Sequence, residues 1–257
     1  MKRLWIGAGA ALALAVALAG CGGGGEQKAE APAAETAGTA TPDEVNGGTV
    51  TGKVAFEGTK PTPKKLDMSA TPSCTRGHAG GQESEEVVVN GNGTLKNAFV
   101  WVKSGLPNMR WQRSTEPVVL DQSGCMYRPH VLALMTGQNL TIRNSDPTNH
   151  NIHATPKVNQ EWNETQAPGT PEKTQSFARQ EIMLPIKCNI HPWMRSYVNV
   201  VTHPFFAVTG DDGSFTIKGL PPGTYTVEVV HEKYGAQEQQ ITVGAKESKT
   251  ADFTIKG

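Results

Sequence analysis

Residues 209–234 of this 257-residue chain read TGDDGSFTIKGLPPGTYTVEVVHEKY, and they predict β-strands separated by sharp turns. Asp212-Gly213 is a turn signal that favours a hairpin, and Pro221-Pro222-Gly223 predicts a second, rigid turn. After each turn apolar residues alternate with polar ones, which is typical of a strand with one buried face. The residues predicted to face inward are Phe215, Ile217, Tyr225, Val227 and Val229.

The same pattern extends in both directions from this stretch. Short apolar or alternating runs are separated by Gly, Asn and Pro, and none keeps the apolar period of a helix. Many short strands with such turns predict an all-β chain built from β-sandwiches. The further predicted elements are a strand at 48–58, two short strands around an Asn-Gly turn within 85–103, a hairpin within 131–146, a strand at 196–203 and three strands after residue 221.

Two segments resemble one known family. The strand GTVTGKVAFEG, residues 48–58, looks like the start of a carboxypeptidase regulatory-like, or transthyretin-like, module. Residues 209–234 resemble its second half, with the core pattern D-G-x-F-x-I…L-P-P-G-x-Y-x-V. The chain between these pieces is longer than such a module needs. The resemblance therefore implies a discontinuous sandwich domain, 47–114 and 203–257, with a second domain, 115–202, inserted into it.

The N-terminus has the pattern of a secretion signal. Two basic residues precede an apolar run that extends to Ala19 and is short for a membrane span. The run ends in LAGC, which resembles the bacterial lipobox, and this implies cleavage before Cys21 and lipidation of that cysteine. Residues 1–20 are thus predicted to be a lipoprotein signal peptide. Residues 21–46, which lack aromatic residues and are rich in Gly, Ala, Glu, Thr and Pro, are predicted to be a disordered tether.

These features predict an exported protein that is anchored by lipid to the bacterial cell envelope, in the periplasm or at the cell surface. The charges balance, with 24 basic and 24 acidic residues. Nothing in this composition indicates a nucleic-acid partner.

Three cysteines remain once Cys21 is assigned to lipid. The segments CTRGH and CMYRPH contain Cys74 with His78 and Cys125 with His130, and these four side chains could form a two-Cys, two-His metal site. Because exported proteins lie in an oxidising compartment, a disulfide between Cys74 and Cys125 is the preferred interpretation. That pairing leaves Cys188 as a single thiol.

Residues 186–198, IKCNIHPWMRSYV, explain the single thiol. Cys188, His191 and Met194 lie within one short loop, and a thiolate, an imidazole and a thioether together suit a blue-copper site. Such a site needs a second histidine from another strand. The segment NSDPTNHNIHA, residues 144–154, offers His150 and His153.

The motifs HNIH and CNIHPWM, in this order, resemble the small cupredoxins of the amicyanin and plastocyanin type. The resemblance implies a Greek-key cupredoxin domain that holds one type 1 copper ion. The ligands carried over from the family pattern are His150, Cys188, His191 and Met194, and Asn151 would tie the two ligand loops together. The sequence departs from the family at Pro185, which interrupts the strand before Cys188, and at Trp193, where amicyanins have Phe.

The sequence predicts a membrane-tethered electron carrier rather than an enzyme, with an exported redox protein such as a c-type cytochrome as its partner. The imidazole edge of His191 is expected to reach the surface, within an apolar patch of Pro192 and Trp193. A carbohydrate-binding or structural cell-surface module remains an alternative, with aromatic residues at 101, 111 and 234 as a sugar platform. A copper enzyme is a third hypothesis, but four protein ligands leave no open position for a substrate.

Overall fold

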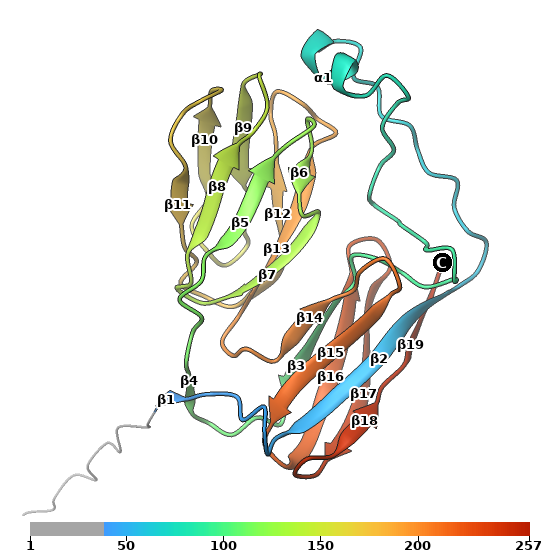
Figure 1. Cartoon of the computed structure of the whole chain (residues 1–257), viewed down its shortest axis with the longest axis vertical. Helices are drawn as coiled ribbons and strands as arrows, with labels where there is room; N and C mark the ends of the chain where they lie inside the picture. The colour runs from blue at the N-terminus through green and yellow to red at the C-terminus, as the bar shows by residue number, and fades with distance from the viewer. Residues whose placement is uncertain (1–38) are drawn as a thin grey trace, which may run out of the picture. The chain divides into compact units, whose positions relative to one another are not determined.

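Strands make up almost all of the regular structure in residues 39–257, the part of the chain that the computed structural model describes (Figure 1). The elements are β1 (Thr39–Ala40), β2 (Gly48–Glu57), α1 (Pro72–Gly77), β3 (Phe99–Ser104), β4 (Arg110–Trp111), β5 (Val118–Gln122), β6 (Tyr127–Arg128), β7 (Val131–Met135), β8 (Leu140–Asn144), β9 (His150–Ala154), β10 (Trp162–Gln166), β11 (Lys173–Gln175), β12 (Glu181–Lys187), β13 (Arg195–Val201), β14 (Phe206–Val208), β15 (Ser214–Leu220), β16 (Gly223–His231), β17 (Gly235–Val243), β18 (Ser248–Thr250) and β19 (Phe253–Lys256). The predicted all-β fold class is confirmed.

The first sandwich is formed by strands between Val118 and Val201. A five-stranded sheet of order β10-β9-β12-β13-β7 faces a four-stranded sheet of order β11-β8-β5-β6 (Figure 1). Both sheets contribute to one buried apolar cluster, which includes Leu120 and Ile142 from one sheet and Ile152 and Val198 from the other. The β13–β7 and β5–β8 pairs are parallel, so the sheets are mixed.

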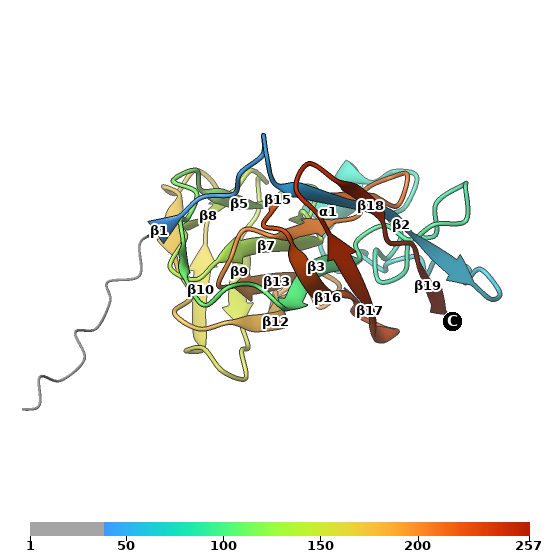
Figure 2. The same cartoon turned by 90° about the horizontal axis from the view of Figure 1, so that it is seen from below.

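The second sandwich combines β2 and β3 with the C-terminal strands. Its sheets have the orders β14-β3-β16-β17 and β15-β2-β18 (Figure 1). The last strand, β19, also pairs with β2 (Figure 2). The side chains predicted to face inward after the two turns are all buried in one cluster: Phe215, Ile217, Tyr225, Val227 and Val229. Alternation within a strand is a local property, and it predicted these faces correctly.

Two predicted hairpins are wrong in their pairing. The strands within 131–146 are β7 and β8, and they lie in different sheets. The strands on either side of Asp212-Gly213, β14 and β15, also lie in different sheets, although Gly213 has φ 67° and the turn itself is present. A turn signal specifies a local reversal of the chain, whereas the partner of each strand depends on which face of the core it covers. Within 85–103 only β3 forms, and the earlier segment contributes an isolated bridge between Val89 and Leu95.

Ordered structure begins earlier than the predicted end of the tether at residue 46. β1 pairs in parallel with β4, and Ala40 packs against the core of the second sandwich. The carboxylate of Asp43 accepts hydrogen bonds from the backbone N–H groups of Val45 and Asn46 and fixes the following turn. Residues 1–38, with the predicted signal peptide, Cys21 and most of the tether, lie outside the described residues.

The predicted division into an inserted and a discontinuous domain stays a prediction, because residues 39–257 all belong to one compact unit. The segment after β2 contributes to both sandwiches: Cys74 of α1 is buried in the core of the first, and Val87 and Val89 pack against the core of the second. Within residues 39–257, no helix has the length and apolar character that crossing a bilayer would require.

Candidate metal centre

His150, Cys188 and His191 come together at one end of the first sandwich. The two Nδ1 atoms of the histidines are 3.0 Å apart, and the Sγ atom of Cys188 is 3.8 Å from Nδ1 of His191. One donor atom from each residue lies within 4.8 Å of the others, and all three side chains are buried. The structure thus assembles a compact set of two nitrogen donors and one sulfur donor from two loops that lie far apart in the sequence.

Strand pairing positions these loops. His150 is the first residue of β9, and Cys188 directly follows β12, which pairs with β9. The loop from Cys188 to Met194 is closed by backbone hydrogen bonds from Cys188 N–H to Met194 O, 3.2 Å, and from Met194 N–H to His191 O, 2.9 Å. These bonds hold three candidate ligands on one turn.

Pro185 does not interrupt β12 as the sequence predicts. The strand continues through it to Lys187, and Pro185 lies opposite Tyr197 in the middle of the sheet. The register shifts between Glu181 and Leu184, where Met183 has φ 54°. The Pro185 carbonyl accepts the N–H of Thr155 on the side of β9, and the ladder between β12 and β9 begins only at Ile186. The N–H that a proline lacks would therefore fall at the end of that ladder, where its loss is tolerated.

His150 is oriented by an acidic residue that the sequence analysis did not identify. Its Nε2 lies 2.8 Å from Oδ2 of Asp146, so the N–H is on Nε2 and the Nδ1 lone pair faces the site. Burial lowers the pKa of His150, but the hydrogen bond to Asp146 and the proximity of Cys188 outweigh burial and raise it above its ordinary value. The sequence signal for this contact was the position of Asp146, an acidic residue four positions before the first histidine of the HNIH motif.

The sulfur of Cys188 lies in an environment that favours the thiolate. Burial raises the pKa of this thiol, but His150 and the backbone N–H groups of Asn151 and His191 outweigh burial and lower the pKa. Both backbone N–H groups lie 3.4 Å from the sulfur. A deprotonated sulfur is the form that binds a metal ion.

His191 does not reach the surface, contrary to the sequence-based expectation. Its exposed fraction is 1%, and its Nε2 lies 4.0 Å from Sγ of Cys74. Burial, followed by the positive charge of His150, lowers the pKa of His191 and favours the neutral imidazole. The ring of Trp193, which is half-buried, packs 5.1 Å from the ring of His191.

The remaining candidates around the motifs fall into two groups. Met194 is fully buried in the same core cluster as Cys188. The side chain of Asn151 accepts a hydrogen bond from the N–H of Asn189 at 3.1 Å, so it joins the two ligand loops. His153, by contrast, turns away from the site and contacts Asn189 and Glu161.

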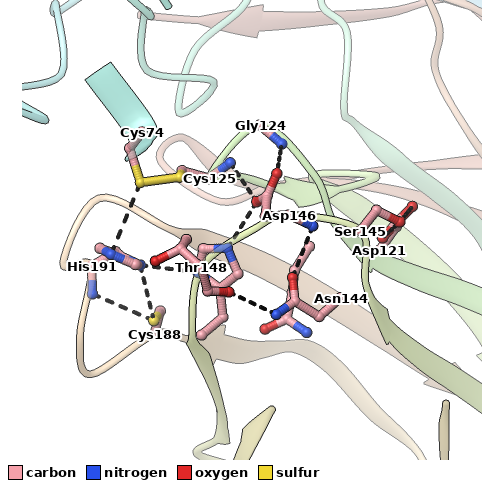
Figure 3. Close-up of polar contacts among 12 residues, drawn as sticks. Cys74, Asp121, Gly124, Cys125, Asn144, Ser145, Asp146, Thr148, Cys188 and His191 are labelled. Atoms are coloured by element: carbon pink, nitrogen blue, oxygen red, sulfur yellow. Dashed lines mark hydrogen bonds and ion pairs between the residues drawn. A yellow bond between two sulfur atoms is a disulfide. The ribbon is translucent and has the colours of Figure 1, made fainter. Parts of the chain in front are cut away.

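Cys74 and Cys125 form a disulfide, so they are not available as thiolate ligands (Figure 3). The alternative two-Cys, two-His cluster is not assembled. His78 contacts the carbonyl oxygen of Gly124 through Nε2. His130 lies between the carbonyl oxygen of Arg195 and the carboxylate of Glu232.

The chemistry of the converging atoms fits copper. Two ring nitrogens that face each other at 3.0 Å must share a hydrogen or an ion, and the third donor is a buried sulfur with a lowered pKa. Two His and one Cys with a methionine nearby is the donor set of blue-copper sites. The inner positions would be supplied by His150, Cys188 and His191, and Met194 is the candidate for a weak axial contact.

The family model of the carboxypeptidase regulatory-like domain matches residues 196–256. This is the C-terminal part of the predicted discontinuous domain, and the match begins within β13 of the first sandwich. No curated protein matches the chain.

The solved structures that are similar to this chain include cupredoxins. A methionine-to-alanine variant of amicyanin in its Cu(I) form is 20% identical over 39% of this chain and 97% of its own length, with a TM-score of 0.29. A purple cupredoxin from Nitrosopumilus maritimus is 20% identical over 33% and 97%, with a TM-score of 0.28. A copper-containing nitrite reductase from Thermus scotoductus SA-01 is 20% identical over 33% of this chain and only 22% of its own length, with a TM-score of 0.30. At these TM-scores the likenesses carry no conclusion about function.

Proposed function

We propose that this protein is an exported type 1 copper protein that transfers single electrons. The observation that supports the proposal most directly is the convergence of His150, His191 and Cys188, each with one donor atom within 4.8 Å of the others, in a buried site. A bound copper ion would supply a one-electron redox couple. The protein would supply a thiolate, two oriented imidazoles and an environment that excludes water.

A carrier role fits the site better than an enzyme role. The candidate ligands are almost fully buried, with exposed fractions of 0% for His150, 3% for Cys188, 1% for His191 and 0% for Met194. A substrate would need an open coordination position that it could reach. An electron needs no such opening, and a rigid, buried set of ligands changes little between the two oxidation states.

Copper binding can be tested on a soluble form that lacks residues 1–21. Adding one equivalent of Cu(II) should produce an intense visible absorption from the bond between copper and the Cys188 sulfur. Zinc, which also binds Cys and His, would give no such band. A colourless protein with copper bound would contradict the type 1 assignment, and a protein that binds no copper would contradict the proposed function altogether.

The axial role of Met194 has its own test. The Met194→Gln variant should still bind copper while its reduction potential changes, because the axial ligand tunes the potential more than it holds the ion. An unchanged potential would place the axial contact elsewhere.

The lipid anchor at Cys21, the envelope location and the redox partner of the c-type cytochrome class belong to the same proposal. The disulfide between Cys74 and Cys125 supports export to an oxidising compartment. Cys21→Ser should block lipidation, so the protein should no longer partition into detergent. Electron exchange with a c-type cytochrome, followed by absorption spectroscopy, tests the partner class.

The carbohydrate-binding alternative is not favoured by the positions of its aromatic residues. Trp101 and Trp111 are 4% and 9% exposed, and Trp101 donates a hydrogen bond to Glu228 in the interior. Tyr234 is partly buried against the core of the second sandwich. These residues do not form an exposed stacking platform of the kind that a sugar ring would need.

A further inference from the structure

The Cys74–Cys125 disulfide lies against the outer side of the candidate metal centre. Cys125, Asp146 and His150 form a second group whose donor atoms lie within 4.8 Å of one another, and the first group shares His150 with it. On the other side, Cys74 Sγ lies 4.0 Å from His191 Nε2 (Figure 3). The Nε2 atom of His191 therefore contacts the disulfide through Cys74. The Nε2 atom of His150 contacts Asp146, which lies between His150 and Cys125 of the same disulfide.

The connection to His150 runs through Asp146. The carboxylate of Asp146 accepts the N–H groups of Gly124 at 2.7 Å and Cys125 at 2.8 Å (Figure 3). The same carboxylate contacts His150 Nε2. Gly124 and Cys125 have φ values of 65° and 51°, so their N–H groups point in the same direction and bind the carboxylate as a small anion nest. Positive φ is unfavourable for Cys125, and the disulfide is one constraint that holds this residue in place.

The connection to His191 runs through α1 and Trp193. Cys74 of α1 is 1% exposed and covers the imidazole edge that the sequence predicts to be at the surface. The indole N–H of Trp193 donates to the carbonyl oxygen of Cys125 at 3.0 Å, while the Trp193 ring packs against His191. His78, just after α1, contacts Gly124 O on the same turn.

We propose that the Cys74–Cys125 disulfide is a positioning element of the metal centre, which orients both imidazoles from their outer sides and fastens the segment around α1 as a cover over His191. The proposal deepens the proposed copper function and rests on it. The cover closes the route by which a partner protein or a small chelator would touch the imidazole of His191. Opening the disulfide would expose this edge and loosen the nest that holds Asp146.

A dithiol reductant is the chemical class that would open the cover. The S–S bond breaks, Cys74 and Cys125 each gain one electron and one proton, and the reductant becomes a disulfide. The overall change is a two-electron exchange between two sulfur pairs, and it requires no participation of the metal.

The test compares the wild-type protein with the Cys74→Ser/Cys125→Ser double variant, both as the full chain without residues 1–21. In the metal-free proteins, NMR should show faster hydrogen exchange for the ring N–H of His150, and protease should cleave the segment 60–82 in the variant but not in the wild type. In the copper-loaded proteins, a Cu(I) chelator should remove the metal about 10- to 100-fold faster from the variant, the usual size of an effect from outer contacts of metal ligands. Treating the metal-free wild type with a phosphine, which is oxidised to the phosphine oxide with oxygen from water as the disulfide is reduced to two thiols, should reproduce the exchange and protease changes without any substitution.

Phe253→Ala is the matched control. Phe253 is buried in the second sandwich, so its loss destabilises the fold without touching the disulfide or the ligands. If the control releases copper as fast as the double variant, the effect reflects lost stability and the proposal fails. Equal ring N–H exchange, protection from protease and chelator rates in variant and wild type would also overturn it. Failure of the wild type to bind copper would refute the proposed function instead, while the metal-free measurements would still test the cover.

Discussion

The two sandwiches differ in what their interiors contain. The first buries several side chains with polar atoms, including His150, Asn151, Cys188 and His191, and the two histidines and the cysteine converge at one end of its sheets. The second buries mainly Val, Ile and Phe, and its buried Glu228 is paired with Trp101 and Lys103. Burying polar groups costs free energy unless they have partners.

The difference shows where donor atoms that could hold a metal ion gather. In the second sandwich the buried carboxylate of Glu228 is paired with side chains of the protein, so its burial can be explained by structure alone. In the first, two imidazole nitrogens and a sulfur face one another, and a metal ion would satisfy all three. The second sandwich thus contributes mainly to stability. The first buries polar donor atoms at a cost in stability, and these atoms form the candidate metal centre.

The largest effect is expected from Cys188→Ala, which removes the one free cysteine thiol among residues 39–257 and with it the proposed strong bond to copper. The visible absorption should disappear completely, and Cu(II) binding should weaken strongly, while circular dichroism should still show a folded β protein. Absorption titration with Cu(II) measures this. A variant that keeps the intense band would show that the first sandwich is not the functional one.

Phe253→Ala should lower the stability of the protein and leave its copper binding unchanged. Its ring is 2% exposed and packs 6.1 Å from the ring of Phe215, so its removal should lower the free energy of unfolding by about 3–5 kcal/mol. The copper absorption of the protein that remains folded should not change. Urea unfolding, followed by fluorescence and by the copper band separately, measures both. A loss of the band before global unfolding would mean that the two sandwiches are functionally coupled.

A pH effect of about 3 kcal/mol is expected from His203, which packs against Trp101 and Phe205. Burial lowers the pKa of His203 from 6.5 to about 4. Between these values the unfolded state binds a proton that the native state does not, so the free energy of unfolding falls as the pH drops from 6.5 to about 4. No carboxylate opposes this shift, whereas Asp146 raises the pKa of His150.

The His203→Asn variant tests the pH effect, because Asn can still accept the N–H of Phe205 but does not titrate in this range. Its stability should depend less steeply on pH than that of the wild type. Identical slopes from urea unfolding at several pH values would show that His203 titrates normally.

The smallest effect is expected from Asn151→Ala. The variant loses the side-chain link to Asn189 but keeps the backbone N–H that points at the Cys188 sulfur. Copper affinity should fall by about 10- to 100-fold, with the absorption band retained. Asn163→Ala is the control, because Asn163 is exposed and contacts Asn151 from the side away from the ligand loop. Equal affinities in the two variants would show that the link between the loops does not support the site.

The sequence by itself determined the features that depend on short spacing. Alternating residues after Asp212-Gly213 and Pro221-Pro222-Gly223 gave the strands and their buried faces, because the direction of a side chain in a strand depends only on its position. The motifs HNIH and CNIHPWM contain the residues that converge. Cys188 and His191 are three residues apart in one tight loop, so their side chains lie close together.

Only the tertiary structure decided the features that join distant parts of the chain. It placed β7 and β8 in different sheets, brought Asp146 to His150, and laid Cys74 against His191 across 117 positions of sequence. The exposure of His191 was wrongly predicted for the same reason. A local pattern shows that a residue lies in a loop, but whether another segment covers that loop depends on packing between elements, which leaves no periodic signal in the sequence.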